Sequence, residues 1–283
     1  MVKVAYITPG GSVHDEQWLT KLRQYFEVVT GPDWGVDIVQ SGPIAYHSTF
    51  GENVALINKC PFVMMSWAFD VLETKPGFLP SLYESALECI VAAADAFLCD
   101  SNVVRDKLLE LRQGDPPPII QFPWGVDLEM FQPDTSTPEK VFLARERGLS
   151  VTQRAFVIAN KPWFTTRMRH TSMPAQYRMS WAYICASPSD GSSVSLLEAM
   201  ASGLPVIVSD IAGNREWVAH HVNGWLCKHD DPQAFADAIV ECASMSAAER
   251  KRMGAANRAV VEARADWHKN FEKLVEAYHG LAK

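Results

Sequence analysis

The first half of the chain alternates short apolar runs with amphipathic segments, and this alternation constrains its fold most strongly. The apolar runs have the length and composition of buried strands, and the segments between them have helical spacing. Strands that alternate with helices form a parallel sheet covered on both faces. The predicted strands are Lys3–Thr8, Phe26–Thr30, Val36–Gln40, Pro61–Ser66, Ala96–Cys99 and Ile119–Phe122, and the predicted helices are Asp15–Tyr25, Glu52–Lys59, Leu79–Ala94 and Val103–Arg112.

The second half follows the same pattern, so the fold class is α/β with two parallel-sheet domains. Between the halves, Gln121–Pro133 indicates a strand leaving the first sheet, a Gly turn and a proline-marked linker. We therefore predict domains over residues 1–133 and 134–283, with the last helix free to pack back on the first domain. The second set of predicted elements comprises strands Phe156–Asn160, Tyr183–Ser187, Pro205–Ser209 and Gly224–Lys228 and helices Val194–Ala201, Pro232–Ser244, Ala247–Arg264 and Trp267–Leu281.

Composition narrows the class of protein. With 283 residues, 48% hydrophobic content and a net charge of −7, the chain is typical of a globular protein and disfavours nucleic acid as a partner. Six cysteines without paired spacing favour reduced thiols and a cytoplasmic location. The N-terminus has the pattern of a strand, and we expect neither a signal peptide nor a membrane span.

The stretch Ser187–Asp210 predicts a loop, a short helix and a strand. Ser192 or Ser193 suits the N-cap, so free backbone N–H groups near the helix start would attract an anion. Glu198 lies about 6 Å further along the helix axis than Val194, roughly the step from a diphosphate to its ribose. Asp190, in the loop, could accept hydrogen bonds from a sugar. The alternative is that Asp190 caps the helix and Glu198 is a solvated helical residue.

This stretch resembles the sugar-nucleotide site of retaining glycosyltransferases of the GT-B fold, in the GT4 group (glycosyl transferases group 1). Their signature has two glutamates separated by seven residues, then Ala-Met-Ala, a glycine and a Pro-Val strand. The chain matches it except that Asp190 replaces the first glutamate. The resemblance implies two Rossmann-like domains facing a cleft, with Glu198 on the ribose and Asp190 as a catalytic residue on the transferred sugar. It also implies a donor-binding loop made of Gly191, Ser192, Ser193 and Val194.

Three further segments supply candidate residues. Gly10 and Gly11 follow the first strand, where backbone N–H groups could approach the donor, or they form a simple tight turn. Asp70 ends a buried strand and resembles the family's sugar- or acceptor-facing acid, although Trp67 stands where many relatives have histidine; the alternative is a capping role. Lys161, placed after the predicted strand Phe156–Asn160, would bind the diphosphate, and Arg167 or Arg169 could provide the second cation.

Between Ile158 and Tyr183 the family pattern leads us to expect about two more strand–helix units. The second domain is therefore predicted to be shortened by an internal deletion.

The function predicted from the resemblance is transfer of a sugar from a nucleotide-diphosphate-sugar to an acceptor hydroxyl, with retention and without a metal. The acceptor is a sugar, a lipid-linked molecule or a small molecule, and peripheral membrane contact stays open. The donor is a co-substrate, so no cofactor is expected. The alternatives are a catalytically silent sugar-nucleotide-binding protein and a GT-B sugar-nucleotide epimerase.

Overall fold

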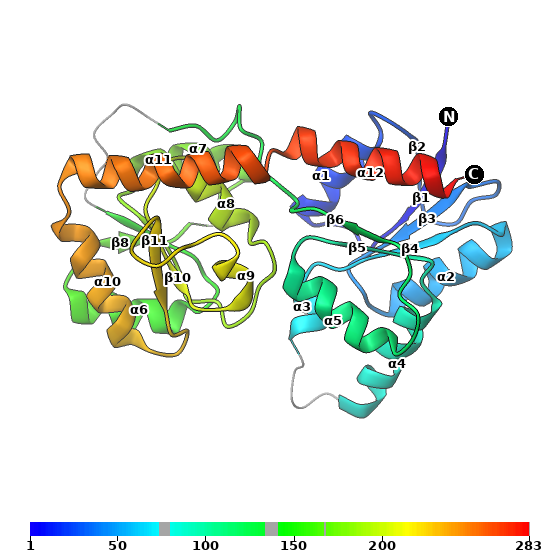
Figure 1. Cartoon of the computed structure of the whole chain (residues 1–283), viewed down its shortest axis with the longest axis horizontal. Helices are drawn as coiled ribbons and strands as arrows, with labels where there is room; N and C mark the ends of the chain where they lie inside the picture. The colour runs from blue at the N-terminus through cyan, green and yellow to red at the C-terminus, as the bar shows by residue number, and fades with distance from the viewer. Residues whose placement is uncertain (74–79, 134–140, 167, 283) are drawn as a thin grey trace. The chain divides into compact units, whose positions relative to one another are not determined.

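A computed structural model describes residues 1–73, 80–133, 141–166 and 168–282 of the chain (Figure 1). The protein consists of two compact units. The first comprises Met1–Pro123 and Phe271–Lys283, and the second comprises Trp124–Asn270. The end of the last helix thus returns to the unit that begins the chain.

In the described part of the first unit, six parallel strands form one sheet in the order β2-β1-β3-β4-β5-β6. The central strands β3, β4 and β5 are buried along their whole length, as expected for a parallel sheet covered on both faces. The strands are β1 (Lys3–Ile7), β2 (Glu27–Thr30), β3 (Ile38–Ser41), β4 (Phe62–Met65), β5 (Ala96–Cys99) and β6 (Ile119–Gln121).

Helices cover this sheet on two sides (Figure 1). On one side α2, α4 and α5 pack on the strands through a continuous apolar core. On the other side, Trp18 of α1 contacts Phe271 of α12, and Tyr278 of α12 donates a hydrogen bond to Gln40. The helices of this unit are α1 (Val13–Leu22), α2 (Tyr46–Asn58), α3 (Phe69–Leu72), α4 (Pro80–Ala93), α5 (Asn102–Arg112) and α12 (Trp267–Leu281), the last of which begins in the second unit.

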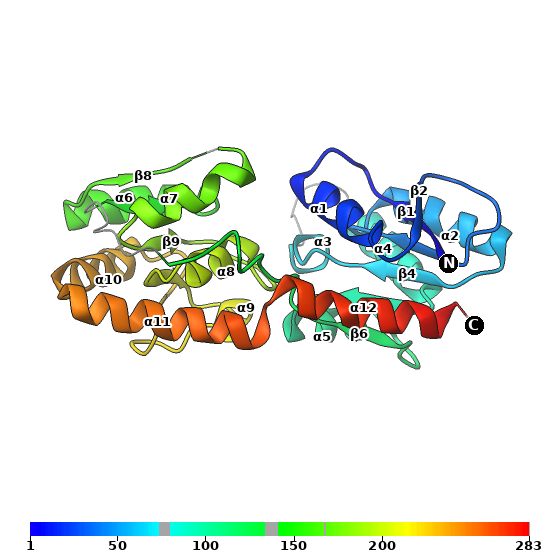
Figure 2. The ribbon, with the colours of Figure 1, turned by 90° about the horizontal axis from the view of Figure 1, so that it is seen from above.

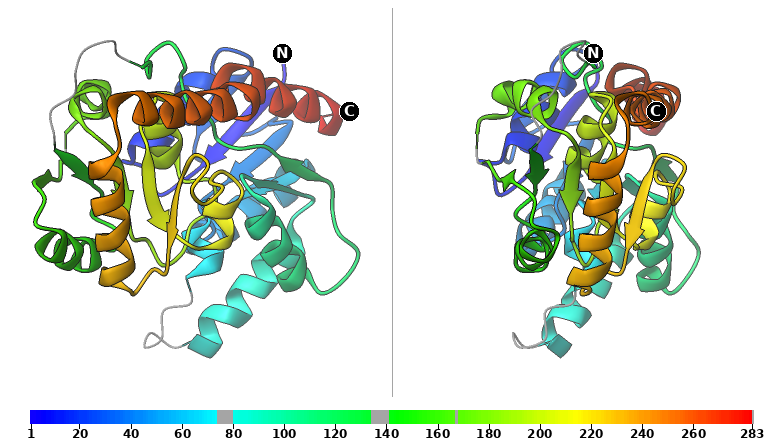
Figure 3. Two further views of the ribbon diagram at one scale, coloured as in Figure 1. Left: turned by 60° about the vertical axis from the view of Figure 1, so that its left-hand side comes forward. Right: turned by 90° about the vertical axis from the view of Figure 1, so that its left-hand side faces the viewer.

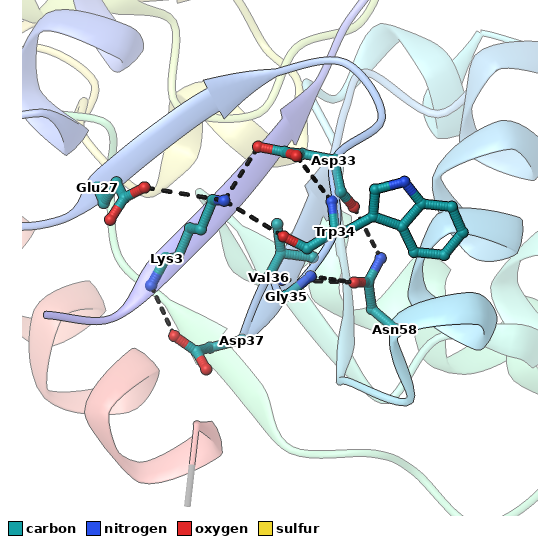
Figure 4. A network of polar contacts seen from close by, with 8 residues as sticks. All are labelled: Lys3, Glu27, Asp33, Trp34, Gly35, Val36, Asp37 and Asn58. Atoms are coloured by element: carbon teal, nitrogen blue, oxygen red, sulfur yellow. Dashed lines mark hydrogen bonds and ion pairs between the residues drawn. The ribbon is translucent and has the colours of Figure 1, made fainter.

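A polar network closes the amino-terminal edge of the first sheet (Figure 4). Lys3 Nζ lies 3.0 Å from a carboxylate oxygen of Asp33 and donates to the Trp34 carbonyl. Asn58, at the end of α2, accepts from Gly35 N and donates to the Asp33 carbonyl. These contacts order the β2–β3 loop. The candidate residues of this unit, Gly10, Gly11 and Asp70, lie at the opposite, carboxyl-terminal edge of the sheet, because they follow β1 and β4.

In the described part of the second unit, five parallel strands form a sheet in the order β11-β10-β9-β7-β8. Side chains alternate between its faces: Val206 and Val208 of β10 enter one core cluster, and Ile207 between them enters the other. The strands are β7 (Phe142–Ala144), β8 (Trp163–Phe164), β9 (Tyr183–Cys185), β10 (Val206–Ser209) and β11 (Gly224–Cys227).

Two helix layers enclose this second sheet as well. Helices α8 and α11 pack together on one face, and α6 and α10 pack together on the other. Figure 2 looks onto the side of α7 and α11, and Figure 3 shows α11 lying across the strands. The helices of this unit are α6 (Leu149–Ala159), η1 (His170–Ser172), α7 (Met173–Met179), α8 (Val194–Ala201), α9 (Ala212–Arg215), α10 (Pro232–Ser244) and α11 (Ala247–Arg264).

The predicted fold class is confirmed, and one predicted strand is wrong. Residues 156–159 end helix α6 instead of forming a strand, and Asn160 is its C-cap. Phe156 and Ala159 continue a buried helical face with Thr152 and Ala155, whereas Val157 and Ile158 are exposed. The first strand of this sheet in chain order is β7, which was not predicted. Two strands, β7 and β8, therefore precede β9 where one was expected. The internal deletion stays a prediction, as do the domain limits at 133 and 134.

Candidate functional site

The candidate site lies at the carboxyl-terminal edge of the second sheet. Strands β7, β9 and β10 run parallel with Leu143 paired to Tyr183 and Tyr183 paired to Val206, so the segments that follow them leave the same edge. Those segments are Arg145–Gly148, Ala186–Ser193 and Asp210–Ile211. Ligands of open parallel sheets bind at this edge.

Two glycines let these segments approach each other closely. Gly148 has φ +72°, and a Cβ there would lie 2.0 Å from the carbonyl oxygen of Ala186. A Cβ on Gly213 would lie 2.3 Å from the carbonyl oxygen of Asp190. Any larger side chain at either position would push the segment after β9 away. The backbones of Gly148 and Gly213 therefore contact the segment that carries Asp190 from two sides.

Asp190 is the acid of this loop. Its Oδ1 accepts a hydrogen bond from Gly191 N at 3.0 Å, and its Oδ2 lies 3.7 Å from a guanidinium nitrogen of Arg147. The Asp190 side chain is 18% exposed and that of Arg147 is 42% exposed. An acid that is partly open to solvent beside a cation can still accept hydrogen bonds from a ligand.

Helix α8 starts where the sequence predicts it. Ser193 is the N-cap in an extended conformation, and its side chain makes no capping hydrogen bond within the described structure. Ser195 Oγ instead pairs with the hydroxyl of Tyr183 at 2.8 Å. The Ser193 hydroxyl therefore does not cap the first-turn N–H groups of α8. The amino-terminal end of this helix carries a positive potential.

Glu198 is buried in the middle of α8, where it is 5% exposed. Its Oε1 lies 2.7 Å from Nε2 of His170, and its Oε2 accepts a hydrogen bond from the Tyr177 hydroxyl at 2.9 Å. The interpretation of Glu198 as a solvated helical residue is therefore wrong. A carboxylate has about four lone-pair positions, so two of them remain after these contacts.

The structure points to two cations that were not predicted from the sequence. Arg145 and Arg147 directly follow β7, at the same edge as the Asp190 loop. Burial works against the charge of Arg145, but Tyr183, Tyr177 and Glu198 nearby raise its pKa. A short apolar run followed by two arginines and a glycine was the available signal, but the prediction placed the first strand of this sheet at residues 156–160 instead.

Lys161, in contrast, precedes β8 and so lies near the amino-terminal edge of the parallel sheet, because β8 pairs in parallel with β7. The reason for choosing it, a strand ending at Asn160, was wrong. Arg167 lies outside the described residues, and Arg169 is exposed just before η1.

In the first unit, Asp70 is 4% exposed and accepts hydrogen bonds from residues of the same unit. Its carboxylate accepts hydrogen bonds from Ile44 N at 2.7 Å, from Ser66 Oγ at 2.7 Å and from Trp67 N at 3.1 Å. Burial outweighs these contacts and raises the pKa of Asp70 to about 6. These bonds fix a strained turn at Ala68, which has φ +72°. The contacts of Asp70 are those of a structural cap, and its catalytic role stays a prediction.

Gly10 and Gly11 form an exposed loop at the same edge of the first sheet. Both have positive φ, and a Cβ at either one would meet nothing within 4 Å. Gly10 N donates to Thr8 Oγ1, and Thr8 in turn donates to Asp15 at 2.6 Å. The backbone here is ordered and open, as a close approach to a ligand requires. A role in donor binding stays a prediction.

Two features are absent from the residues that the structure describes: a cluster of metal-ligating side chains and a helix able to cross a membrane. Its residues contain no group of three or more His, Cys, Asp or Glu side chains placed to hold a metal ion. None of its described helices combines the length and apolar character needed to cross a membrane.

Part of this site lies in a segment that matches a family model. Residues 154–260 match the family model described as glycosyl transferases group 1. The matched segment covers 107 of the 283 residues and lies within the second unit. This segment includes Asp190, Glu198 and the whole of α8, and it ends within α11.

Sequence relatives match part of the chain. A stretch of 93 residues, 33% of this chain and 23% of the relative, is 40% identical to the amylovoran biosynthesis glycosyltransferase AmsK of Erwinia amylovora. A stretch of 118 residues, 41% of this chain and 31% of the relative, is 31% identical to spore coat protein SA of Bacillus subtilis. The matches therefore span less than a third of either relative.

Solved structures match along the whole chain. Sucrose-phosphate synthase from Thermosynechococcus elongatus has a TM-score of 0.79 at 14% identity, over 99% of both chains. Anabaena HepE, solved in complex with UDP, has a TM-score of 0.78 at 14% identity, over 99% of this chain and 100% of HepE. At this identity the likeness shows the GT-B fold alone. The family segment and the name of AmsK agree with the predicted class of enzyme, a glycosyltransferase.

Proposed function

We propose that the chain transfers a sugar from a nucleotide-diphosphate-sugar to an acceptor hydroxyl, with retention of configuration and without a metal ion. One observation carries this proposal. The segment after β7 and the loop that leads into α8 leave one sheet edge together. They bring Arg145, Arg147 and Asp190 near a helix start that the Ser193 side chain does not cap, and Glu198 follows within that helix. The name of AmsK, a glycosyltransferase, agrees with this reaction, and the UDP bound to HepE agrees with this choice of donor.

Each group has a role that its position supports. The diphosphate would bind to the backbone N–H groups of Gly191 to Val194, which lead into α8, and to the guanidinium groups of Arg145 and Arg147. These groups would stabilise the charge that grows on the diphosphate as it leaves. The two lone-pair positions left on Glu198 would accept the ribose hydroxyls. Asp190 would accept a hydroxyl of the transferred sugar. The charge that a metal ion would provide thus comes from side chains and the helix end.

The reaction needs position and electrostatics more than a protein nucleophile. The bond between the sugar's anomeric carbon and the diphosphate oxygen breaks through an oxocarbenium-like state. The acceptor oxygen bonds to the same face of that carbon, and its proton passes to the departing diphosphate. The protein's contribution is to hold the acceptor on the face of the sugar that carries the diphosphate and to stabilise the leaving charge.

A panel of UDP-, GDP- and ADP-sugars, with and without candidate acceptors, tests this proposal. We expect one of them to release its nucleoside diphosphate in proportion to glycoside formed, at an unchanged rate in EDTA, and to give a product with the anomeric configuration of the donor by NMR. Nucleotide binding without turnover would favour the silent binding protein. A rearranged sugar nucleotide without a glycoside would favour the epimerase, and a rate lost in EDTA and restored by manganese would contradict the metal-free reaction.

A further inference from the structure

His170 is fixed against a buried aromatic side chain. Its ring centroid lies 5.4 Å from that of Phe131, which is 1% exposed. Phe131 also contacts Tyr177 at 5.8 Å, and its carbonyl accepts a hydrogen bond from Arg258 of α11. The imidazole thus packs on Phe131, which is itself held by Tyr177 of α7 and Arg258 of α11.

The fixed imidazole points one nitrogen at the buried acid. Nε2 of His170 lies 2.7 Å from Oε1 of Glu198, and the Tyr177 hydroxyl binds the other oxygen. The His170 side chain is 24% exposed, whereas that of Glu198 is 6% exposed. Two contacts on two different oxygens leave the carboxylate a single orientation. A carboxylate held in this way loses less rotamer freedom when a ligand binds.

We propose that His170 is a positioning residue, which holds Glu198 as an ionised, oriented acceptor for the ribose hydroxyls of the donor. This inference rests on the proposed function of the site. His170 touches neither sugar nor diphosphate in this account, and it acts through Glu198. As an imidazolium it compensates the charge of a carboxylate that burial would otherwise disfavour.

The charges around His170 define the pH range in which this should operate. The hydrogen bond to Glu198 raises the pKa of His170 above its usual value of 6.5, against the opposing effect of burial, and the charge of Asp127 adds to the increase. Tyr177 faces the same carboxylate from α7, Arg145 interacts with it from the segment after β7, and Arg258 contacts the Phe131 carbonyl from α11. A raised pKa means that the charged pair is complete below 6.5 and is lost as pH rises through the pKa of the folded protein. Donor affinity should fall over the same interval.

Three substitutions of His170 separate positioning from packing. A glutamine amide can place its nitrogen near the position of Nε2, whereas an asparagine amide is too short to reach it. We therefore expect His170→Ala and His170→Asn to weaken binding of the tightest of UDP, GDP and ADP about tenfold at pH 6, measured by calorimetry, because a charge-assisted hydrogen bond is lost. His170→Gln should stay within about threefold of wild type and lose the pH dependence between 6 and 8.

His221→Asn is the matched control. His221 pairs with Glu241 at 3.2 Å, but both side chains are more than half exposed, and asparagine tolerates its φ of +61°. This variant should bind as wild type does at every pH. Thermal unfolding of each variant shows that it is folded at the temperature of the binding measurement.

The outcomes distinguish failure of the inference from failure of the proposed function. If wild type binds a nucleotide and all three His170 variants bind it equally well, His170 has no positioning role although the function stands. The same conclusion follows if His170→Gln is as weak as His170→Ala and all variants keep the wild-type pH profile. If wild type binds none of the three nucleotides, the proposed function is wrong, and the positioning role is overturned with it.

Discussion

Two buried carboxylates, Asp70 of the first unit at 4% exposure and Glu198 of the second unit at 5%, are bound in different ways. Asp70 of the first unit accepts hydrogen bonds from two backbone N–H groups and a serine close to its own turn. Glu198 of the second unit is bound by the side chains of His170 and Tyr177, which lie on other elements. The contacts of Asp70 come mostly from backbone that is fixed with the fold, whereas the two side-chain contacts of Glu198 leave lone-pair positions open for a ligand. Burial alone therefore does not identify a binding acid.

The largest effect should come from Asp70→Ala. This change leaves the N–H groups of Ile44 and Trp67 buried without their acceptor, and we expect it to lower the free energy of unfolding by about 2–4 kcal/mol at pH 5. Chemical denaturation of both proteins measures this difference. Asp106→Ala is the control, since the Asp106 side chain is 64% exposed and should contribute less than about 0.5 kcal/mol. A loss of nucleotide affinity with unchanged stability would reverse the roles assigned to the two acids.

The stability difference between wild type and Asp70→Ala should also depend on pH. The pKa of Asp70 is raised to about 6 from 3.8, so the folded protein binds its proton more tightly than the unfolded chain does. The contribution of Asp70 is then greatest below pH 4 and falls as pH rises to about 6, by up to about 3 kcal/mol. Denaturation of both proteins from pH 4 to 8 measures the change. A difference that grew with pH would mean that the acid is stabilised as a carboxylate.

Glu198→Gln should mainly affect binding. Glutamine keeps the size of the side chain but loses the charge, so we expect nucleotide affinity to fall by about 1.5–3 kcal/mol, or roughly 10- to 100-fold. Calorimetry with UDP, GDP and ADP gives the affinity, and denaturation gives the stability. An unchanged affinity together with a large loss of stability would make Glu198 a structural acid like Asp70.

Asp190→Asn should affect turnover more than nucleotide binding. Asp190 is 18% exposed beside Arg147, where it would contact the sugar and not the nucleotide. We expect about a tenfold lower rate of sugar transfer and a nucleotide affinity within about threefold of wild type, from the loss of one charged hydrogen bond. Steady-state rates with the best donor provide the test. Equal rates in both proteins would favour a purely capping role.

The smallest effect should come from Tyr177→Phe, which removes one of the two donors to Glu198 but keeps the ring that packs on Phe131. We expect nucleotide affinity to fall by about 0.5–1.5 kcal/mol. Binding at pH 6 to this variant, to His170→Ala and to the double variant measures the coupling between the two donors. Strict additivity would contradict the idea that both act on one oriented carboxylate.

The sequence by itself determined the class of fold and most elements of both sheets. Helices α8, α10, α11 and α12 have the predicted limits, because N-caps such as Ser246, a Pro at the start of α10 and Gly203 after α8 are local signals. The loop-helix-strand around Asp190 and Glu198 was predicted for the same reason. Its spacing depends on residues that are neighbours in the chain.

Only the tertiary structure decided which side chains meet at the site. Residues 156–160 are apolar enough for a strand or a helix, and packing of α6 against α10 selects the helix. Because residues 156–159 are helical, Lys161 lies near the amino-terminal edge of the sheet, before β8. Arg145 and Arg147, which follow β7, lie instead at the edge of the Asp190 loop. His170 lies 28 residues from Glu198 in the chain, and their contact exists because α8 and the segment before α7 pack around Phe131. Such contacts depend on packing between distant segments, which no local pattern in the sequence encodes.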